Sequence, residues 1–94
     1  MKTNLQKLFK DTTLKYFDDY TYFVKILWKP LMQVEGGGQL HNVVGDSGGW
    51  TKYGVAYNKN KDLFLSLEDF KGLTESDAQL IAFNIYYINS FTHL

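Results

Sequence analysis

Apolar side chains recur every three or four residues near the start of the chain. Between residues 7 and 27 the repeating positions are Phe9, Thr13, Phe17, Tyr20, Val24 and Leu27. This spacing is typical of a helix with one apolar face. The pattern therefore predicts one long helix, or two, over this region.

The next helical element is expected to begin at a proline. Pro30 disfavours helical angles at Lys29 but suits the first turn of a helix. A new short helix is therefore expected over residues 30–35, stopping at Gly36. Glu35 would then lie in its last turn.

The periodicity disappears in the glycine-rich stretch VEGGGQLHNVVGDSGGWTKYGVAY, residues 34–57. Such a composition favours turns and a twisted hairpin over a helix. We expect this hairpin over residues 36–58, with VGDSGG as its turn and WTKYGVAY as the strand that follows. YNKNKD is expected to form another turn.

Two capping signals mark the helices of the C-terminal third. Ser66 is placed to cap a short helix over LEDFKG that closes at Gly72, and Thr74 with Asp77 forms a near capping box. The last helix has two apolar faces and is expected to have two neighbours. One face comprises Leu73, Ala78, Ile81, Ile85 and Ile88, and the other comprises Leu80, Phe83, Tyr87 and Phe91.

These elements make a mainly helical α+β domain that spans residues 1–94. The sequence is 45% hydrophobic and 17% aromatic, enough to form a core. Net charge is zero and every basic residue is a lysine. Nucleic acid is not an expected partner, because its binders are normally basic and use arginine on phosphates and bases.

The composition also bears on metals and on location. No cysteine is present, His41 and His93 do not have metal-ligand spacing, and neither a metal nor a cofactor is expected. The start MKTNLQKLFKDTT lacks the apolar stretch of a secretory signal. No membrane span is expected either, because lysines and Pro30 interrupt the most apolar segment. We expect synthesis in the cytoplasm, with release by another agent.

Position distinguishes one glutamate from the other two. Glu68 and Glu75 lie in the first turns of their predicted helices, where a carboxylate stabilises the helix dipole. Glu35 lies at the opposite, negative end of its helix, beside apolar residues. Both features disfavour the charged form, so a raised pKa and a general-acid role are predicted. The alternative is a surface glutamate before a glycine cap.

Asp46 and Thr51 follow Glu35 within the glycine-rich stretch. Two carboxylates across a groove are the usual equipment for breaking a glycosidic bond, and the Thr51 hydroxyl could hold a water. Asp46 has an alternative role in turn formation. Flat rings stack on sugars, so Trp50, Tyr53 and Tyr57 are candidate substrate contacts or core residues. His41 is either a sugar contact or a polar surface group.

The same residues resemble a known family. The sequence contains EGG, followed after eight residues by DSGGWTKYGV, and this pattern is similar to that of the family 108 glycoside hydrolases. The later segment LTESDAQLIAFNIYY resembles the second sequence block of that family. The resemblance implies a lysozyme-like catalytic domain of the phage endolysin type. It implies cleavage of the β-1,4 bond between N-acetylmuramic acid and N-acetylglucosamine in bacterial peptidoglycan. Glu35 corresponds to the catalytic acid, and Asp46 and Thr51 to hairpin positions facing it.

Departures from that pattern leave alternatives open. Gly38 replaces an aromatic residue and Ser47 replaces a proline, which predicts a looser hairpin. The chain stops where relatives continue into a helical peptidoglycan-binding region. We therefore expect Tyr87 and Phe91 to be exposed and to bind a second copy or a partner domain. A lytic transglycosylase, an inactive peptidoglycan-binding module and a phage structural module remain alternatives.

Overall fold

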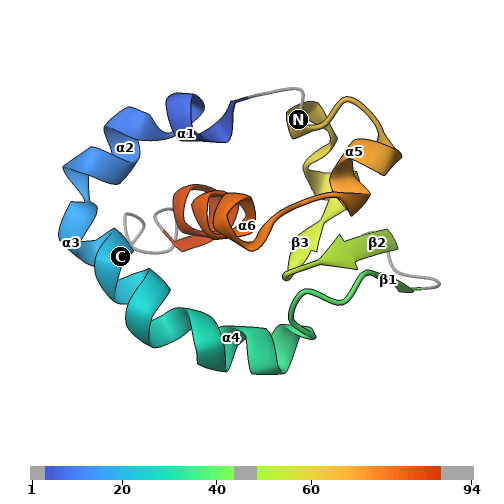
Figure 1. Ribbon diagram of the computed structural model, residues 1–94, viewed down its shortest axis with the longest axis horizontal. Coiled ribbons are helices and arrows are strands. Elements are labelled where there is room, and N and C mark those ends of the chain that lie inside the picture. The colour runs from blue at the N-terminus through green and yellow to red at the C-terminus, as the bar shows by residue number, and fades with distance from the viewer. Residues whose placement is uncertain (1–3, 44–48, 88–94) are drawn as a thin grey trace.

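Helical segments form an arc around one central helix (Figure 1). The computed structural model describes residues 4–43 and 49–87. The arc consists of α1 (Leu5–Leu8), α2 (Lys10–Lys15), α3 (Phe17–Tyr22), the π-helical turn η1 (Phe23–Leu27) and α4 (Trp28–Glu35). The central element consists of α6 (Glu75–Ile81) and the π-helical turn η4 (Ala82–Tyr87).

A small sheet and short helices close the other side of the molecule. The strands are β1 (His41–Val43), β2 (Gly49–Lys52) and β3 (Val55–Ala56). They are followed by the 3-10 turns η2 (Tyr57–Lys59) and η3 (Lys61–Leu63), and by α5 (Leu67–Lys71). The described chain is therefore mainly helical with a three-stranded antiparallel sheet, in agreement with the predicted α+β class.

The predicted N-terminal helix is divided into shorter pieces. The backbone leaves helical angles at Phe9 and at Tyr16, where ψ is 8° and 41°. These bends let the arc curve around α6, whereas a straight helix would leave the core after a few turns. Asn84 in η4 donates a 3.2 Å hydrogen bond to the Thr13 hydroxyl and ties the arc to the central element.

The expected break at Lys29 is absent. Helix α4 begins at Trp28, so Lys29 and Pro30 both lie inside it. The Trp28 N–H donates to Phe23 O, five residues back, which widens the turn just before the proline. A π-helical turn is one of the ways a helix absorbs a local disruption of its hydrogen bonding. The prediction of a new helix starting at Pro30 is therefore wrong.

The predicted second strand of the hairpin is two strands. β2 pairs with β1 in the register His41↔Thr51, and Lys52 pairs with Val55 in β3. Tyr53 and Gly54 form the two-residue turn between β2 and β3, with φ of 51° and 75°. Two consecutive positive φ values fit the turn type whose twist matches a hairpin. The prediction of one strand over WTKYGVAY is therefore wrong.

Both predicted caps are present. The Ser66 hydroxyl accepts a hydrogen bond from Asp69 N, and the Thr74 hydroxyl accepts one from Asp77 N, each at 3.3 Å. Gly72 follows α5 as predicted. Glu68 and Glu75 lie in the first turns of α5 and α6, which confirms their predicted positions.

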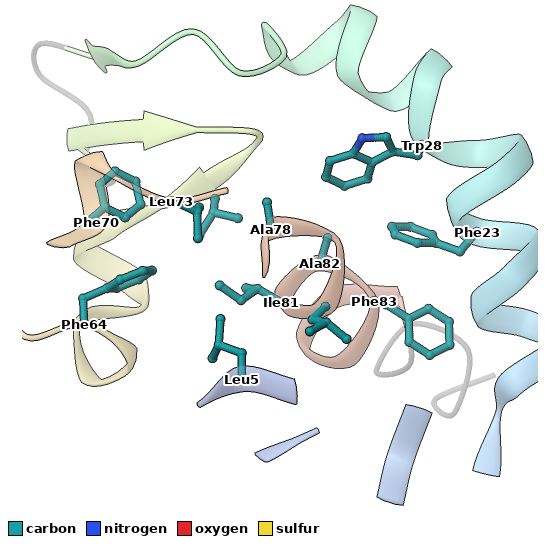
Figure 2. Close-up of a cluster of buried hydrophobic side chains, with 12 residues drawn as sticks. Leu5, Phe23, Trp28, Phe64, Phe70, Leu73, Ala78, Ile81, Ala82 and Phe83 are labelled. Atoms are coloured by element: carbon teal, nitrogen blue, oxygen red, sulfur yellow. The ribbon is translucent and has the colours of Figure 1, made fainter. Parts of the chain in front are cut away.

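Helix α6 is buried on two sides. Figure 2 shows Phe64 and Phe70 on the side of the sheet and α5, and Phe23 and Trp28 on the side of the arc. The buried apolar residues are Leu5, Phe23, Trp28, Val55, Phe64, Phe70, Leu73, Ala78, Leu80, Ile81, Ala82 and Phe83. The prediction of two neighbours for the last helix is confirmed for its described part.

Tyr87 is packed, contrary to the expectation that it would be exposed. Its ring stacks on Phe83 at a centroid distance of 5.3 Å and contacts Phe23 at 5.3 Å. Phe23 of the arc therefore covers part of this face, and Tyr87 is half-buried. Ile88 and Phe91 lie outside the described residues. Among the described helices, none has the length and apolar character to cross a membrane.

Candidate functional site

Helix α4 ends at Glu35, the position predicted from the sequence. Gly36 follows with a left-handed φ of 86°, and its N–H donates to Met32 O. Gly37 N also donates to Met32 O, at 2.9 Å. Glycine reaches this left-handed cap without steric cost, so EGG is a local stop signal. The Glu35 side chain itself lies outside the described part of the chain.

His41 lies against the end of this helix. A Cβ atom built on Gly36 would lie 3.3 Å from His41 Cε1, so the imidazole occupies the space beside the cap. His41 Nδ1 lies 3.1 Å from Gln39 O. The ring is half-buried, and these contacts hold it near the backbone that leaves Glu35.

Thr51 lies beside His41. The two residues are directly opposite in the β1–β2 pair, so their side chains share one face of the sheet. Thr51 is half-buried and donates a long hydrogen bond of 3.4 Å to Gly49 O. The structure therefore brings Thr51, His41 and the end of α4 into one neighbourhood. Asp46 lies outside the described residues, as does most of the predicted VGDSGG turn.

The three candidate aromatic contacts lie in different environments. Trp50 precedes Thr51 and so points to the opposite face of β2, where Lys71 Nζ lies 4.8 Å from its ring centroid. Tyr57 packs against Phe70 and Phe64 at centroid distances of 5.3 and 6.2 Å. These contacts favour a structural role for Tyr57, and they separate Trp50 from His41 and Thr51.

Tyr53 lies between the helix end and the core. Its N–H donates to Gly37 O at 2.8 Å, and its ring centroid lies 6.4 Å from that of Trp28. The ring lies beside Gly38, where a Cβ atom would come within 2.7 Å of Tyr53 Cζ. Gly38 thus leaves room for Tyr53, and the contact constrains the loop that the sequence predicted to be loose.

A groove of about 400 Å³ adjoins these residues. Its described lining consists of Phe23, Leu31, Met32, Tyr53, Gly54, Ala56, Lys59, Ala82, Tyr86 and Tyr87. Ala56 pairs with Thr51, so the groove lies on the face of the sheet that carries Thr51. Leu31 and Met32, which precede Glu35 by four and three residues in α4, both line the groove.

Two polar side chains that the sequence analysis did not single out line the groove, those of Lys59 and Tyr86. The buried Asn60 amide donates to Ala56 O at 2.8 Å and to the Tyr86 hydroxyl at 3.0 Å. Lys59 lines the same groove. These residues are far apart along the chain from Leu31 and Met32, and no local sequence pattern links them.

The chain matches no protein-family model, no curated protein and no solved structure in the comparisons made. Among the described residues, no group of three or more histidine, aspartate or glutamate side chains is arranged to hold a metal ion.

Proposed function

We propose that the chain is a lysozyme-like peptidoglycan hydrolase that cleaves the β-1,4 bond between N-acetylmuramic acid and N-acetylglucosamine. One observation supports this proposal above the others. Helix α4 ends at Glu35, immediately before a glycine cap that lies against His41. Leu31 and Met32 of the same helix line the groove, as does Ala56, the strand partner of Thr51.

Glu35 is the proposed general acid. The C-terminal end of a helix carries partial negative charge, which favours the neutral, protonated carboxyl over the carboxylate. Protonated Glu35 would donate its proton to the bridging oxygen as positive charge develops on the sugar ring. This role requires an acid that keeps its proton near neutral pH.

Asp46 and Thr51 are proposed to act on the opposite side of the bond. Asp46 would either activate a water held by Thr51 or stabilise the positive sugar ring directly. In known glycosidases, carboxyl groups about 5 Å apart accompany attack by the second carboxylate, and separations of roughly 6.5 Å or more leave room for a water. The stereochemical outcome follows from that separation.

The groove has the size and lining of a ligand site. A volume of about 400 Å³ lies within the range of small-molecule sites, which are mostly apolar with a few polar groups. Tyr53 supplies an aromatic wall, and His41 borders the helix end. These two residues are the best supported sugar contacts among those predicted. The proposed partner is bacterial peptidoglycan, reached after release from the cytoplasm.

Clearing of a peptidoglycan suspension tests the proposal. The wild-type chain is expected to lower turbidity and Glu35→Gln to abolish this activity, because the amide cannot donate the proton. Glu68→Gln is the matched control, because Glu68 is exposed and lies in the first turn of α5. Activity should also fall in Asp46→Asn.

Two results would contradict the hydrolase. If Glu35→Gln clears as fast as wild type, Glu35 is not the acid. If neither chain clears the suspension but both bind it, the chain is a wall-binding module. Mass spectrometry of the products identifies the reaction, since hydrolysis leaves a reducing end and a lytic transglycosylase leaves an anhydro sugar.

A further inference from the structure

Lys59 is the charged residue among the described lining of the groove. The other described lining side chains are apolar or are neutral tyrosines. Lys59 is exposed, and none of the ion pairs, hydrogen bonds or ring contacts found within residues 4–43 and 49–87 involves its side chain. As far as the described residues go, its ammonium group is available to pair with a ligand.

The lysines near Lys59 differ from it in this respect. Lys52 Nζ donates to Lys71 O at 2.7 Å, Lys71 pairs with Glu68 at 3.3 Å, and Lys61 Nζ lies 5.8 Å from the Tyr57 ring centroid. Each of these three cations is used within the fold. Among these lysines, Lys59 alone has no such partner within the described part of the chain, and it borders the groove.

Tyr86 adds a second donor to the groove. The Asn60 amide donates to the Tyr86 oxygen at 3.0 Å, and Asn60 is only 8% exposed, so this bond holds the phenol in place. Because the oxygen already accepts a bond, its own hydrogen can point to a ligand. Within the described residues the Tyr86 hydroxyl donates to no other group.

A lysine and a hydroxyl donor, with no carboxylate among the described lining, suit an anionic group. We propose that Lys59 and Tyr86 form a subsite for a carboxylate of the peptide branch carried by the glycan strand. The inference rests on the proposed function, because peptidoglycan offers such a carboxylate next to its sugars. The subsite would make the chain prefer glycan that still carries its peptides.

Binding of two soluble ligands tests the subsite separately from catalysis. The probes are an N-acetylglucosaminyl-N-acetylmuramyl disaccharide carrying a tetrapeptide and the same disaccharide without the peptide. Glu35→Gln is used as background so that neither ligand is cleaved. Exposed ion pairs contribute modestly, so we expect a preference of about fivefold for the peptide-bearing ligand, decreasing as salt rises.

Lys59→Gln is expected to remove the preference while leaving affinity for the peptide-free disaccharide unchanged, and Lys59→Arg is expected to retain it. Lys61→Gln is the matched control, because Lys61 is exposed, lies two residues away and does not line the groove. Tyr86→Phe keeps the ring and is expected to weaken the preference in part.

The outcomes separate the two proposals. The subsite is wrong if the chain that keeps Lys59 binds both ligands equally, or if Lys59→Gln keeps the preference. Either result would overturn the subsite even when the wild-type chain clears peptidoglycan. If the wild-type chain cleaves nothing but its binding preference depends on Lys59, the subsite stands and the hydrolase is wrong. The subsite would also be overturned if Lys61→Gln lost as much of the preference for the peptide-bearing ligand as Lys59→Gln does.

Discussion

The ring of Tyr53 fills the space beside Gly38, where a side chain would otherwise begin. A Cβ atom on Gly38 would lie 2.7 Å from Tyr53 Cε1, closer than real Cβ contacts. Tyr53 also has a φ of 51°, which is uncommon for a tyrosine. Its hydrogen bond to Gly37 and its ring contacts therefore hold a strained turn against the loop that follows α4.

Gly38→Ala is expected to destabilise the chain by about 1–3 kcal/mol, because the new methyl group must displace the Tyr53 ring. Urea unfolding measures the change. Gly72→Ala is the control, since a Cβ atom there would meet Asp69 O at an ordinary 3.5 Å. Equal stabilities for the two variants would show that the Tyr53 ring moves without cost.

Ser66→Ala and Thr74→Ala are each expected to cost about 1 kcal/mol, because each removes the hydroxyl that caps a helix. Thermal unfolding should show a lower midpoint for both. Ser76→Ala provides a comparison, since Ser76 is exposed inside α6 and caps nothing. A Ser76 variant as unstable as the other two would count against the capping explanation.

Asn60→Ala is expected to cost about 1–3 kcal/mol, because it removes a buried amide and leaves the Ala56 carbonyl without that donor. Tyr86→Phe should cost less, since Asn60 would keep its bond to Ala56 O. Denaturant unfolding of both variants shows which substitution lowers the free energy of unfolding more. The reverse order would mean that the Tyr86 hydroxyl is the more important partner.

Burial raises the pKa of the Tyr20 hydroxyl above its usual 10.0. In the unfolded chain Tyr20 loses its proton from about pH 10, whereas the folded chain holds it to higher pH. The unfolded state then binds fewer protons, so the free energy of unfolding falls as pH rises through this interval. Tyr20→Phe is expected to lose less stability than wild type between pH 9 and 11.

Chemical denaturation at several pH values measures this difference. The two chains differ at this one residue, so contributions common to both cancel in the comparison. Tyr22→Phe, at an exposed position of the same helix, is the control for the loss of a tyrosine hydroxyl. Identical pH dependence in the Tyr20 variant would contradict the predicted effect of burial.

Signals carried by neighbouring residues were read correctly from the sequence. The end of α4 at Glu35 depends on Gly36, and the starts of α5 and α6 depend on the hydroxyls of Ser66 and Thr74. Each is a local interaction within three or four residues, so sequence spacing alone was sufficient. The two apolar faces of α6 were likewise visible in its periodicity.

Features that depend on tertiary contacts were missed. The turn at Tyr53 places a tyrosine at a positive φ, which only its contacts with Gly37 and Gly38 explain. Trp50 and Thr51 are adjacent in sequence yet point to opposite faces, so they cannot serve one site equally. Lys59 and Tyr86 come to line one groove only after the chain has folded.

The central position of α6 has a consequence for how the protein is made. Synthesis proceeds from the N-terminus, so the arc and the sheet are complete before the ribosome has translated the helix on which both pack. Until then the inward side chains of Phe23 and Trp28 lack their partner and stay open to chaperones or to aggregation. Folding of the described domain is therefore a late event that awaits the emergence of α6.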